Sequence, residues 1–374
     1  MTDSTADESL APYTPEPGET LRFSTTIEPR RFLGISLKNG LLNLVTLTLY
    51  RFWGKTEVRQ RVWRGVRMNE EAFEYTGRGV ELFVGFVIAL FALGLPFLAI
   101  AFGIQFIGEW FILLLLPLYI GMFWLWGFGV FTAFRYMASR TTWRGIRFRL
   151  KGSASSYGLH YLGALFLSSL TAGWFWPHAE RSLASKIWDE LRFGDRRVRF
   201  RMERAERHGI YGAYAIGWVG TLVGYILLLI GVGVIGAVTG VFEPGPDGQP
   251  AQPSILFTLS IYAGLLVVSP FALLIWAPYQ AALLRSIAAG VTVDKAGFKL
   301  NVKALPLWWL TVTNLFFLLI TVGFLMPWVQ ARTARFLIER LESAGEARLD
   351  LAQQTSRGPG SGEGLADAFG FSAI

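Results

Sequence analysis

The residues of this 374-residue chain whose types and spacing could do chemistry are cations placed at every second position. Because side chains of a strand point alternately to opposite faces, such segments predict strands with one apolar and one cationic face. Guanidinium groups on such a face suit anionic lipid headgroups or an acidic cytoplasmic partner. The candidate headgroup-binding or partner-binding residues are Arg144, Arg147, Arg149, Arg197, Arg199 and Arg201.

Three short segments carry this alternation and predict a small cytoplasmic β-layer with one basic face. In two of them Ile146, Phe148 and Leu150, and then Val198, Phe200 and Met202, alternate with arginine or lysine. In the third, Phe298, Leu300 and Val302 alternate with Lys299, Asn301 and Lys303. Phe73 and Tyr75 form a weaker counterpart near the N-terminus.

Other motifs that could do chemistry are weaker. Gly54, Lys55 and Thr56 end like a phosphate-binding loop, but Leu49 stands where that motif needs glycine. The sequence from Thr321 to Phe324 is similar to a potassium selectivity filter, but a repeated turn explains it better. The three histidines have no metal-ligand spacing, and cysteine is absent. The sequence therefore predicts no enzyme, no metal and no cofactor.

The charge distribution predicts how the chain is threaded through a membrane. None of its 35 lysines and arginines lies in residues 79–134 or 209–284. Each of these apolar stretches is long enough for two crossings, and positive charge accumulates in cytoplasmic loops. We therefore expect two transmembrane hairpins, with both termini cytoplasmic and the turns near Gly108 and Gly248 on the other side. The same distribution explains the net charge of +8 without nucleic acid as a partner.

Three further apolar stretches have basic residues on both sides: Leu41–Trp53, Leu159–Trp176 and Ala304–Val329. If all three crossed fully, strongly basic loops would lie on opposite faces of the membrane. Re-entrant or interface-embedded segments avoid that conflict, although a kinked crossing stays open for the third stretch. Aligning Thr46, Thr171 and Thr321 brings the three stretches into register.

The alignment suggests a helix break inside each stretch, because glycine is followed four residues later by proline in two of them. The candidate helix-break or path-lining residues are Thr48, Gly173, Pro177, Gly323 and Pro327. Tryptophan is enriched where helices pass the membrane interface. The candidate interface anchors are Trp53, Trp63, Trp143 and Trp328.

The sequence thus predicts an α-helical polytopic membrane protein with two transmembrane helical hairpins, three repeated re-entrant or interfacial helical units and a small cytoplasmic β-layer. In each unit we expect a strand, a membrane insertion, an interfacial helix and a second strand. The expected parts are a disordered N-terminal tail (1–20), repeat unit 1 (21–78), transmembrane hairpin 1 (79–134), repeat unit 2 (135–208), transmembrane hairpin 2 (209–284), repeat unit 3 (285–342) and a disordered C-terminal tail (343–374).

Several strings resemble the YjgN-like family of bacterial inner-membrane proteins, a domain of unknown function. They begin at Asn43 (NLVTLTLYRFWGKTEVRQRVWRG), Phe73 (FEYTG), Thr141 (TTWRGIRFRLKGS), Leu170 (LTAGWFWP) and Leu319 (LITVGFLMPWVQARTARFL). The resemblance implies a multi-pass helical fold in the bacterial cytoplasmic membrane, and it supplies no reaction, ligand or functional residue. His178 stands where the aligned units have tryptophan.

Two functional hypotheses follow from these features. In the first, the basic face and the interfacial helices bind anionic lipids or a partner and organise the membrane. In the second, the broken helices line a passage for a small solute or lipid, although the predicted spans lack the carboxylates typical of proton coupling. The GxxxG pairs Gly220 with Gly224 and Gly236 with Gly240 could pack inside the fold or support a homo-oligomer.

Overall fold

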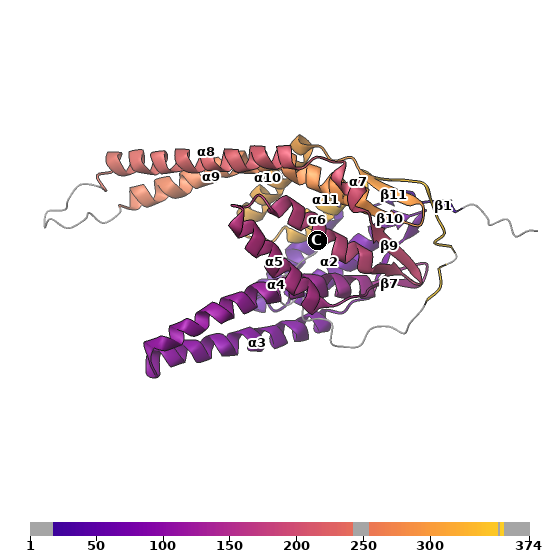
Figure 1. Cartoon of the computed structure of the whole chain (residues 1–374), viewed down its shortest axis with the longest axis horizontal. Coiled ribbons are helices and arrows are strands. Elements are labelled where there is room, and N and C mark those ends of the chain that lie inside the picture. The colour runs from indigo at the N-terminus through magenta and orange to yellow at the C-terminus, as the bar shows by residue number, and fades with distance from the viewer. Residues whose placement is uncertain (1–17, 242–253, 351, 355–374) are drawn as a thin grey trace, which may run out of the picture.

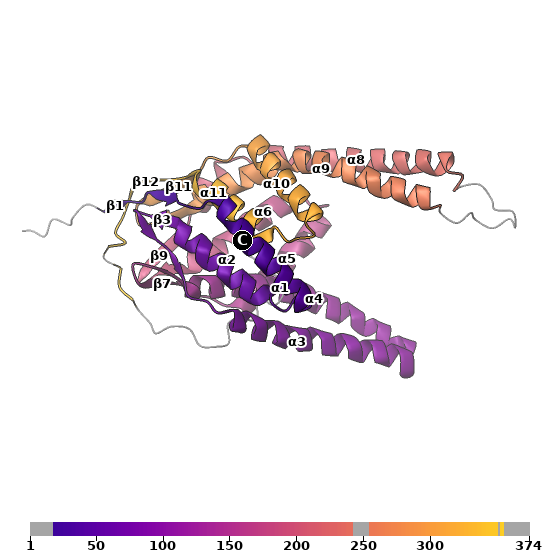
Figure 2. The ribbon, with the colours of Figure 1, turned by 180° about the vertical axis from the view of Figure 1, so that it is seen from behind.

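The computed structural model of the protein describes residues 18–241, 254–350 and 352–354. Two long helical hairpins project from one side of the molecule, and the strands gather at the opposite end (Figures 1 and 2). The hairpin helices are α3 (Gly79–Phe106) with α4 (Leu115–Arg140), and α8 (Tyr211–Val238) with α9 (Ile255–Gly290). These four helices are long and apolar enough to cross a membrane, as the sequence predicts.

The turn of the first hairpin is a short 3-10 helix, η2 (Glu109–Leu114), which begins directly after Gly108. The turn of the second hairpin, with Glu243, Asp247 and Gly248, lies outside the described residues. Large apolar side chains cover the outward surfaces of both hairpins, among them Phe106 and Ile255. Helices that are apolar all round in this way are typical of membrane spans.

Three helical units lie between the hairpins and the strands (Figures 1 and 2). In each unit one helix is followed by a five-residue turn and a second helix. The units are η1 (Pro29–Phe32) continuing as α1 (Leu33–Val45), then α2 (Arg51–Gly65); α5 (Ala154–Leu170), then α6 (Trp176–Glu190); and α10 (Ala304–Ile320), then α11 (Met326–Ile338).

The three units keep one register along the chain. Their first helical segments begin at residues 29, 154 and 304, so corresponding positions are 125 and 150 residues apart. The first segments end at 45, 170 and 320, and the second helices begin at 51, 176 and 326, with the same two spacings. The helical units therefore contain no insertion or deletion relative to one another up to their second helices.

Each turn ends its first helix with the same hydrogen bonds. In the second unit the Gly173 amide donates to the Ser168 carbonyl at 2.7 Å, and the Ala172 amide donates to the Ser169 carbonyl at 3.3 Å. This pair of bonds is a Schellman motif, which needs a left-handed residue after the helix. The second and third residues of the three turns have positive φ: Leu47 and Thr48, Ala172 and Gly173, and Val322 and Gly323.

In the described parts of the chain the strands are short and lie in three antiparallel sheets, of eight, three and two strands. They are β1 (Glu19–Thr20), β2 (Phe23–Thr25), β3 (Val66–Met68), β4 (Glu71–Ala72), β5 (Glu74–Tyr75), β6 (Thr141–Trp143), β7 (Ile146–Leu150), β8 (Leu191–Phe193), β9 (Arg196–Phe200), β10 (Val291–Val293), β11 (Ala296–Leu300), β12 (Leu341–Ala344) and β13 (Glu346–Ala347). Each helical unit is entered from a strand and left into a strand, namely β2 and β3, β7 and β8, or β11 and β12.

The three sheets share one apolar core, and we call the strands around it the β-ring. The eight-stranded sheet runs in the order β12-β11-β10-β9-β8-β7-β6-β5, the three-stranded sheet is β2-β3-β4, and β1 pairs with β13. The shared core includes Met68 from β3, Phe193 from β8 and Val293 from β10. Strand β12 also contacts β2, so the sheets follow one another around this core.

Trp143 occupies the centre of this core and is fully buried. Its ring lies 5.5 Å from that of Phe193 and 6.5 Å from that of Phe73. The prediction that Trp143 anchors the membrane interface is therefore wrong. The side chain points into the β-ring because it belongs to the apolar face of β6.

Two predicted boundaries also need correction. The expected tails overlap the β-ring, because Glu19 pairs with Ala347 and Thr20 pairs with Glu346. The predicted strand from Val198 to Met202 ends early: β9 stops at Phe200, Arg201 is the N-cap residue, and Met202 begins α7 (Met202–Glu206). The rest of each predicted tail, residues 1–17 and 355–374, lies outside the described residues.

Candidate functional site

Three arginines form a row across adjacent strands of the β-ring. Arg149 on β7 lies opposite Arg192 on β8, and Arg192 lies opposite Arg197 on β9. Directly opposed residues of an antiparallel pair share a face, with Cβ atoms about 4.5–5.5 Å apart. We call Arg149, Arg192 and Arg197 the arginine row. Arg147 and Arg199 lie on the same face, because each is two residues away from Arg149 or Arg197 on the same strand.

Opposed like charges are unfavourable in a sheet, so the arginine row needs anions nearby. The Arg192 Nε atom is buried and finds no hydrogen-bond partner among the described residues. The Arg197 Nε atom donates to the backbone carbonyl of Asp189 at 3.2 Å, which uses a neutral acceptor. A buried donor without a partner in a native structure often marks an ion or water that completes the site.

The arginine row lies next to the ends of α5 and α6 that join the strands. Arg192 follows the last residue of α6, Glu190, by two positions, and Arg149 precedes the N-cap residue of α5, Ser153, by four. At about 3.3 Å per strand residue, Arg192 is roughly 7 Å from the end of α6.

The structure brings together four of the six arginines that the sequence singles out. Arg144 instead forms ion pairs with Glu71 at 3.0 Å and Glu19 at 3.4 Å, and its guanidinium lies 4.4 Å from the Trp143 ring centroid. Arg201 caps α7, outside the strand. Arg192 joins the site, although a three-residue strand is too short to reveal alternation.

The candidate helix-break residues occupy the turns and the helix starts after them. Thr48, Gly173 and Gly323 are the third residues of their turns, with φ of 70°, 89° and 82°. Pro177 and Pro327 are the second residues of α6 and α11. Proline is favoured there because the first helical amides have no partner inside the helix. The turns, and not the prolines, therefore break the helices.

The second turn is fixed to α8 by two side chains. The Tyr214 hydroxyl donates to the Gly173 carbonyl at 2.8 Å, and the Trp218 indole donates to the Ala172 carbonyl at 2.9 Å. These bonds satisfy carbonyl groups that lie outside regular helix. The third turn packs differently, since an added Cβ on Gly40 of α1 would lie 2.4 Å from the Phe324 ring.

The remaining predicted interface anchors are at least partly accessible. Trp53 is 41% exposed. The Trp63 indole donates to the Thr141 hydroxyl at 2.9 Å, and its ring lies 5.5 Å from the Tyr75 ring. Trp328 contacts Phe317 with ring centroids 5.1 Å apart. Trp63 therefore serves mainly to join α2 to β6, and Trp53 has the most exposed ring of the four.

Polar side chains inside the helical units are satisfied unequally. In the third unit Arg332 donates to the Thr313 hydroxyl at 2.7 Å and to the Asn314 carboxamide oxygen at 2.9 Å. In the first unit the carboxamide oxygens of Asn39 and Asn43 are buried and find no partner in the described parts of the chain. The sequence indicated these polar groups, and only the structure distinguishes the two units. Among the described residues no group of acidic or histidine side chains could hold a metal ion.

The four apolar helices, the exposed apolar surface and the distribution of cations define a helical membrane protein. Residues 20–368 match the family described as bacterial protein of unknown function (DUF898), and the chain belongs to this family. The predicted resemblance to a bacterial family of unknown function is thereby confirmed. Comparison with curated proteins and with solved structures gave no match.

Proposed function

We propose that this membrane protein binds anionic lipid headgroups of the cytoplasmic leaflet through the arginine row and thereby organises that surface of the membrane. The direct opposition of Arg149, Arg192 and Arg197 on three adjacent strands carries the proposal. Phosphate oxygens would neutralise the opposed charges and accept from the exposed guanidinium groups of Arg197 and Arg199. In this proposal the arginine row lies on the cytoplasmic side of the bacterial inner membrane. Both termini of the chain lie on the same side.

This placement requires the three helical units to enter the membrane from the cytoplasmic side and return. Their first helices have 17 residues in α5 and α10, about 25 Å, which is short of a hydrocarbon core of about 30 Å. At the turns Leu47 is 84% exposed and Val322 is 85% exposed. Apolar side chains exposed at a strained turn are favourable in lipid and unfavourable in water. The three units then act as an internal repeat of re-entrant insertions.

The test is a lipid competition on the purified full chain. Native mass spectrometry would compare adducts of phosphatidylglycerol and phosphatidylcholine on the protein and on the variant Arg149→Gln, Arg192→Gln, Arg197→Gln. Each cation near an anionic surface contributes about 1 kcal/mol, roughly a fivefold change in affinity. We expect the wild-type chain to prefer phosphatidylglycerol several-fold and the variant to lose most of this preference.

The matched control removes three exposed arginines outside the row: Arg30→Gln, Arg31→Gln, Arg61→Gln, with the same change in net charge. It should keep the preference for phosphatidylglycerol. An equal loss in both variants would mean that only the overall positive charge matters, and no preference in the wild-type chain would refute the proposal. Capture of an acidic protein by the row, with no lipid preference, would favour a cytoplasmic partner instead.

The alternative is a passage for a small solute or lipid, lined by the broken turns. It is favoured by the buried carboxamides of Asn39 and Asn43 in the first unit. The packed core of the β-ring, with Trp143 at its centre, weighs against a path along the ring axis. Single cysteines at Thr48, Gly173 and Gly323 would test it: labelling by a water-soluble thiol reagent supports a passage, and protection opposes one.

Self-association through α8 is compatible with either function. An added Cβ on Gly220 would lie 2.5 Å from Ile275 of α9, so this glycine packs inside the fold. Gly224 has no neighbour within 4 Å of such a Cβ. The surface around Gly224 is the part of the GxxxG motif that a second copy would use.

A further inference from the structure

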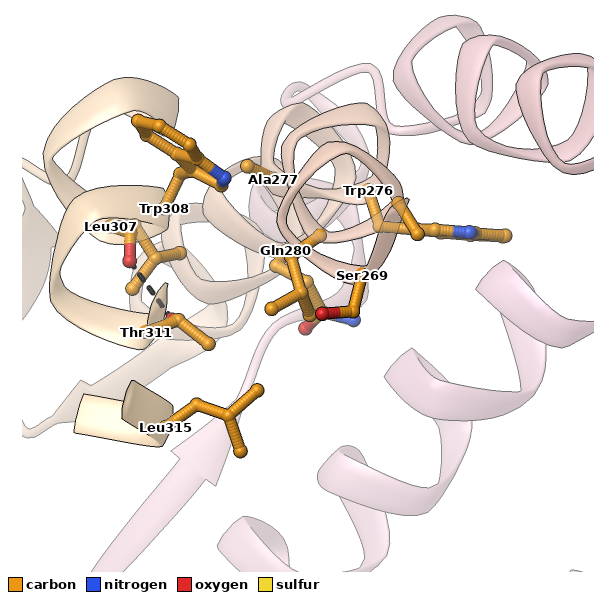
Figure 3. A pocket seen from close by; sticks show the side chains of 10 residues that line it. Ser269, Trp276, Ala277, Gln280, Leu307, Trp308, Thr311 and Leu315 are labelled. Atoms are coloured by element: carbon orange, nitrogen blue, oxygen red, sulfur yellow. Dashed lines mark hydrogen bonds between the residues drawn. The ribbon is translucent and has the colours of Figure 1, made fainter. Parts of the chain in front are cut away.

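A groove lies between α9 and α10, outside the arginine row (Figure 3). Its volume of about 660 Å³ is within the usual range for small-molecule sites. Trp276, Ala277 and Gln280 line it from α9, and Leu307, Trp308 and Thr311 line it from α10. Both helices expose apolar side chains nearby, such as Phe271 and Trp309, so the groove opens sideways toward lipid.

The corresponding helix pair of the second unit is closed, which shows why this groove exists. Helices α4 and α5 precede α9 and α10 by 150 residues, because α5 begins at 154 and α10 at 304. An added Cβ on Gly127 would lie 2.6 Å from Tyr161, and one on Gly158 would lie 2.7 Å from the Trp124 carbonyl oxygen. This glycine contact brings α4 and α5 together.

In the third unit these glycines are replaced by larger residues. Ala277 corresponds to Gly127, and Trp308 corresponds to Gly158, so the close contact cannot form. Around them the third unit has smaller side chains, since Ser269 replaces Tyr119 and Thr311 replaces Tyr161. The larger residues at the contact keep α9 and α10 apart, and the smaller residues beside it leave space between the helices. This space is the groove.

The groove carries several polar groups, and two of them, from Trp308 and Gln280, replace residues without polar side chains in the closed pair. The Ser269 hydroxyl donates to the Leu266 carbonyl at 3.0 Å, which has lost its helical partner because Pro270 has no amide hydrogen. The Trp308 indole donates to the Pro270 carbonyl at 2.8 Å. Gln280 stands in place of Val130 and is exposed, so its carboxamide is accessible to a ligand.

An exposed carboxamide on the apolar helix α9 favours a ligand with a hydrogen-bond acceptor. Cations flank the groove on the strand side of the molecule. Lys303 is the N-cap residue of α10, one turn before Leu307, and Arg285 follows Gln280 by five residues on α9. From the strand side into the groove, a ligand therefore meets first the cations, then the Gln280 carboxamide and then the apolar side chains.

This order matches the phosphate, ester carbonyl and acyl chain of a phospholipid. We propose that the α9–α10 groove binds one phospholipid of the cytoplasmic leaflet. Its phosphate lies near Lys303 and Arg285, an ester carbonyl accepts from Gln280, and an acyl chain lies against Leu307 and Trp308. Different residues carry this site and the arginine row, so either can exist without the other.

The test uses the full chain in nanodiscs that contain a zwitterionic phospholipid with a photoactivatable diazirine in its acyl chain. After irradiation, mass spectrometry maps the labelled residues. We expect labelling within residues 269–280 and 307–315 to exceed that of the corresponding residues 119–130 and 157–165 by about fivefold, the ratio for a 1 kcal/mol preference. A zwitterionic probe separates this site from the arginine row, so Arg192→Gln should leave the labelling unchanged.

Two variants make the result specific. Ser269→Tyr with Thr311→Tyr restores the side chains of the closed pair and should abolish the excess labelling. Gln280→Val, a milder change at an exposed position, should reduce it by removing the amide donor. The control Val267→Tyr changes an α9 side chain that is 65% exposed outside the groove, and it should have no effect.

Equal labelling of the two helix pairs, or labelling that persists in both groove variants, would overturn the proposal. So would crosslinks from the groove to a second copy of the chain, because a protein helix would then be the occupant. Each variant is compared at the same size-exclusion profile as the wild-type protein, so that loss of labelling reports the site and not misfolding.

Discussion

The third residue of each turn in the helical units has positive φ, but its surroundings differ between the units. Substitutions at this position should therefore have graded effects on stability. Gly173 and Gly323 have φ of 89° and 82°, where an L side chain costs about 1–2 kcal/mol. Alanine recovers about 0.4–1 kcal/mol by restricting the unfolded chain. An added Cβ on Gly323 meets nothing within 4 Å, so Gly323→Ala should cost only this difference, about 1 kcal/mol.

Gly173 differs because an added Cβ would lie 3.0 Å from the Tyr214 hydroxyl. That hydroxyl donates to the Gly173 carbonyl at 2.8 Å and must move or lose this bond. A buried carbonyl left without a donor costs about 1–3 kcal/mol. Gly173→Ala should therefore destabilise the protein by about 2–3 kcal/mol, more than Gly323→Ala. Thr48→Gly should have the opposite sign, because φ of 70° strains threonine and not glycine.

The assay is reversible unfolding of the full chain in mixed micelles with a rising mole fraction of sodium dodecyl sulfate, followed by tryptophan fluorescence. The control is the same pair of substitutions in a Tyr214→Phe protein. There the difference between the destabilisation by Gly173→Ala and that by Gly323→Ala should become smaller. Two results would contradict this prediction. One is that Gly323→Ala lowers the free energy of unfolding at least as much as Gly173→Ala, and the other is that the difference between them is unchanged in the Tyr214→Phe protein.

Three further outcomes are expected from the β-ring and its surroundings. Trp143→Ala should cost about 3–5 kcal/mol in the same assay, because the side chain is fully buried; a change below 1 kcal/mol would contradict its central position. Truncation after Ala344 removes β13 and its pairing with β1, so its thermal midpoint in detergent should fall below that of a chain ending at Gln354. Burial, with positive charges nearby, lowers the pKa of His208. The contribution of neutral His208 to the free energy of unfolding is therefore present above about pH 6.5 and lost as the pH falls through the lowered pKa. His208→Gln should flatten part of the resulting dependence of the thermal midpoint on pH.

The helical parts of the fold could be predicted because their signals are local. A long run without lysine or arginine identifies each hairpin, and threonine at 46, 171 and 321 sets the register of the three turns. The alternation in β7 likewise reveals a cationic face within five residues. Each of these patterns depends on neighbours in the chain, which the sequence displays directly.

The β-ring could not be predicted in this way because its strands are held by distant partners. Strand β8 has three residues, so its arginine has too little alternation around it to indicate a face. Strands β1 and β13 have two residues each, which is too short for alternation to be recognised. Trp143 was misassigned because tryptophan is common both at membrane interfaces and in cores, and only the pairing of β6 selects the core.

The exposure of strand edges gives a physical reason for the two ends of the chain to meet. Short strands are marginally stable by themselves, and an open edge presents unpaired amides and carbonyls to other chains. The unit junctions β5–β6 and β9–β10 pair Tyr75 with Thr141 and Phe200 with Val291. The β13–β1 pairing continues this register between the third unit and the first. Pairing of the terminal strands thus covers the edges that β1 and β13 would otherwise expose, and it places residues from both ends of the chain, Leu21 and Ala347, in one apolar core.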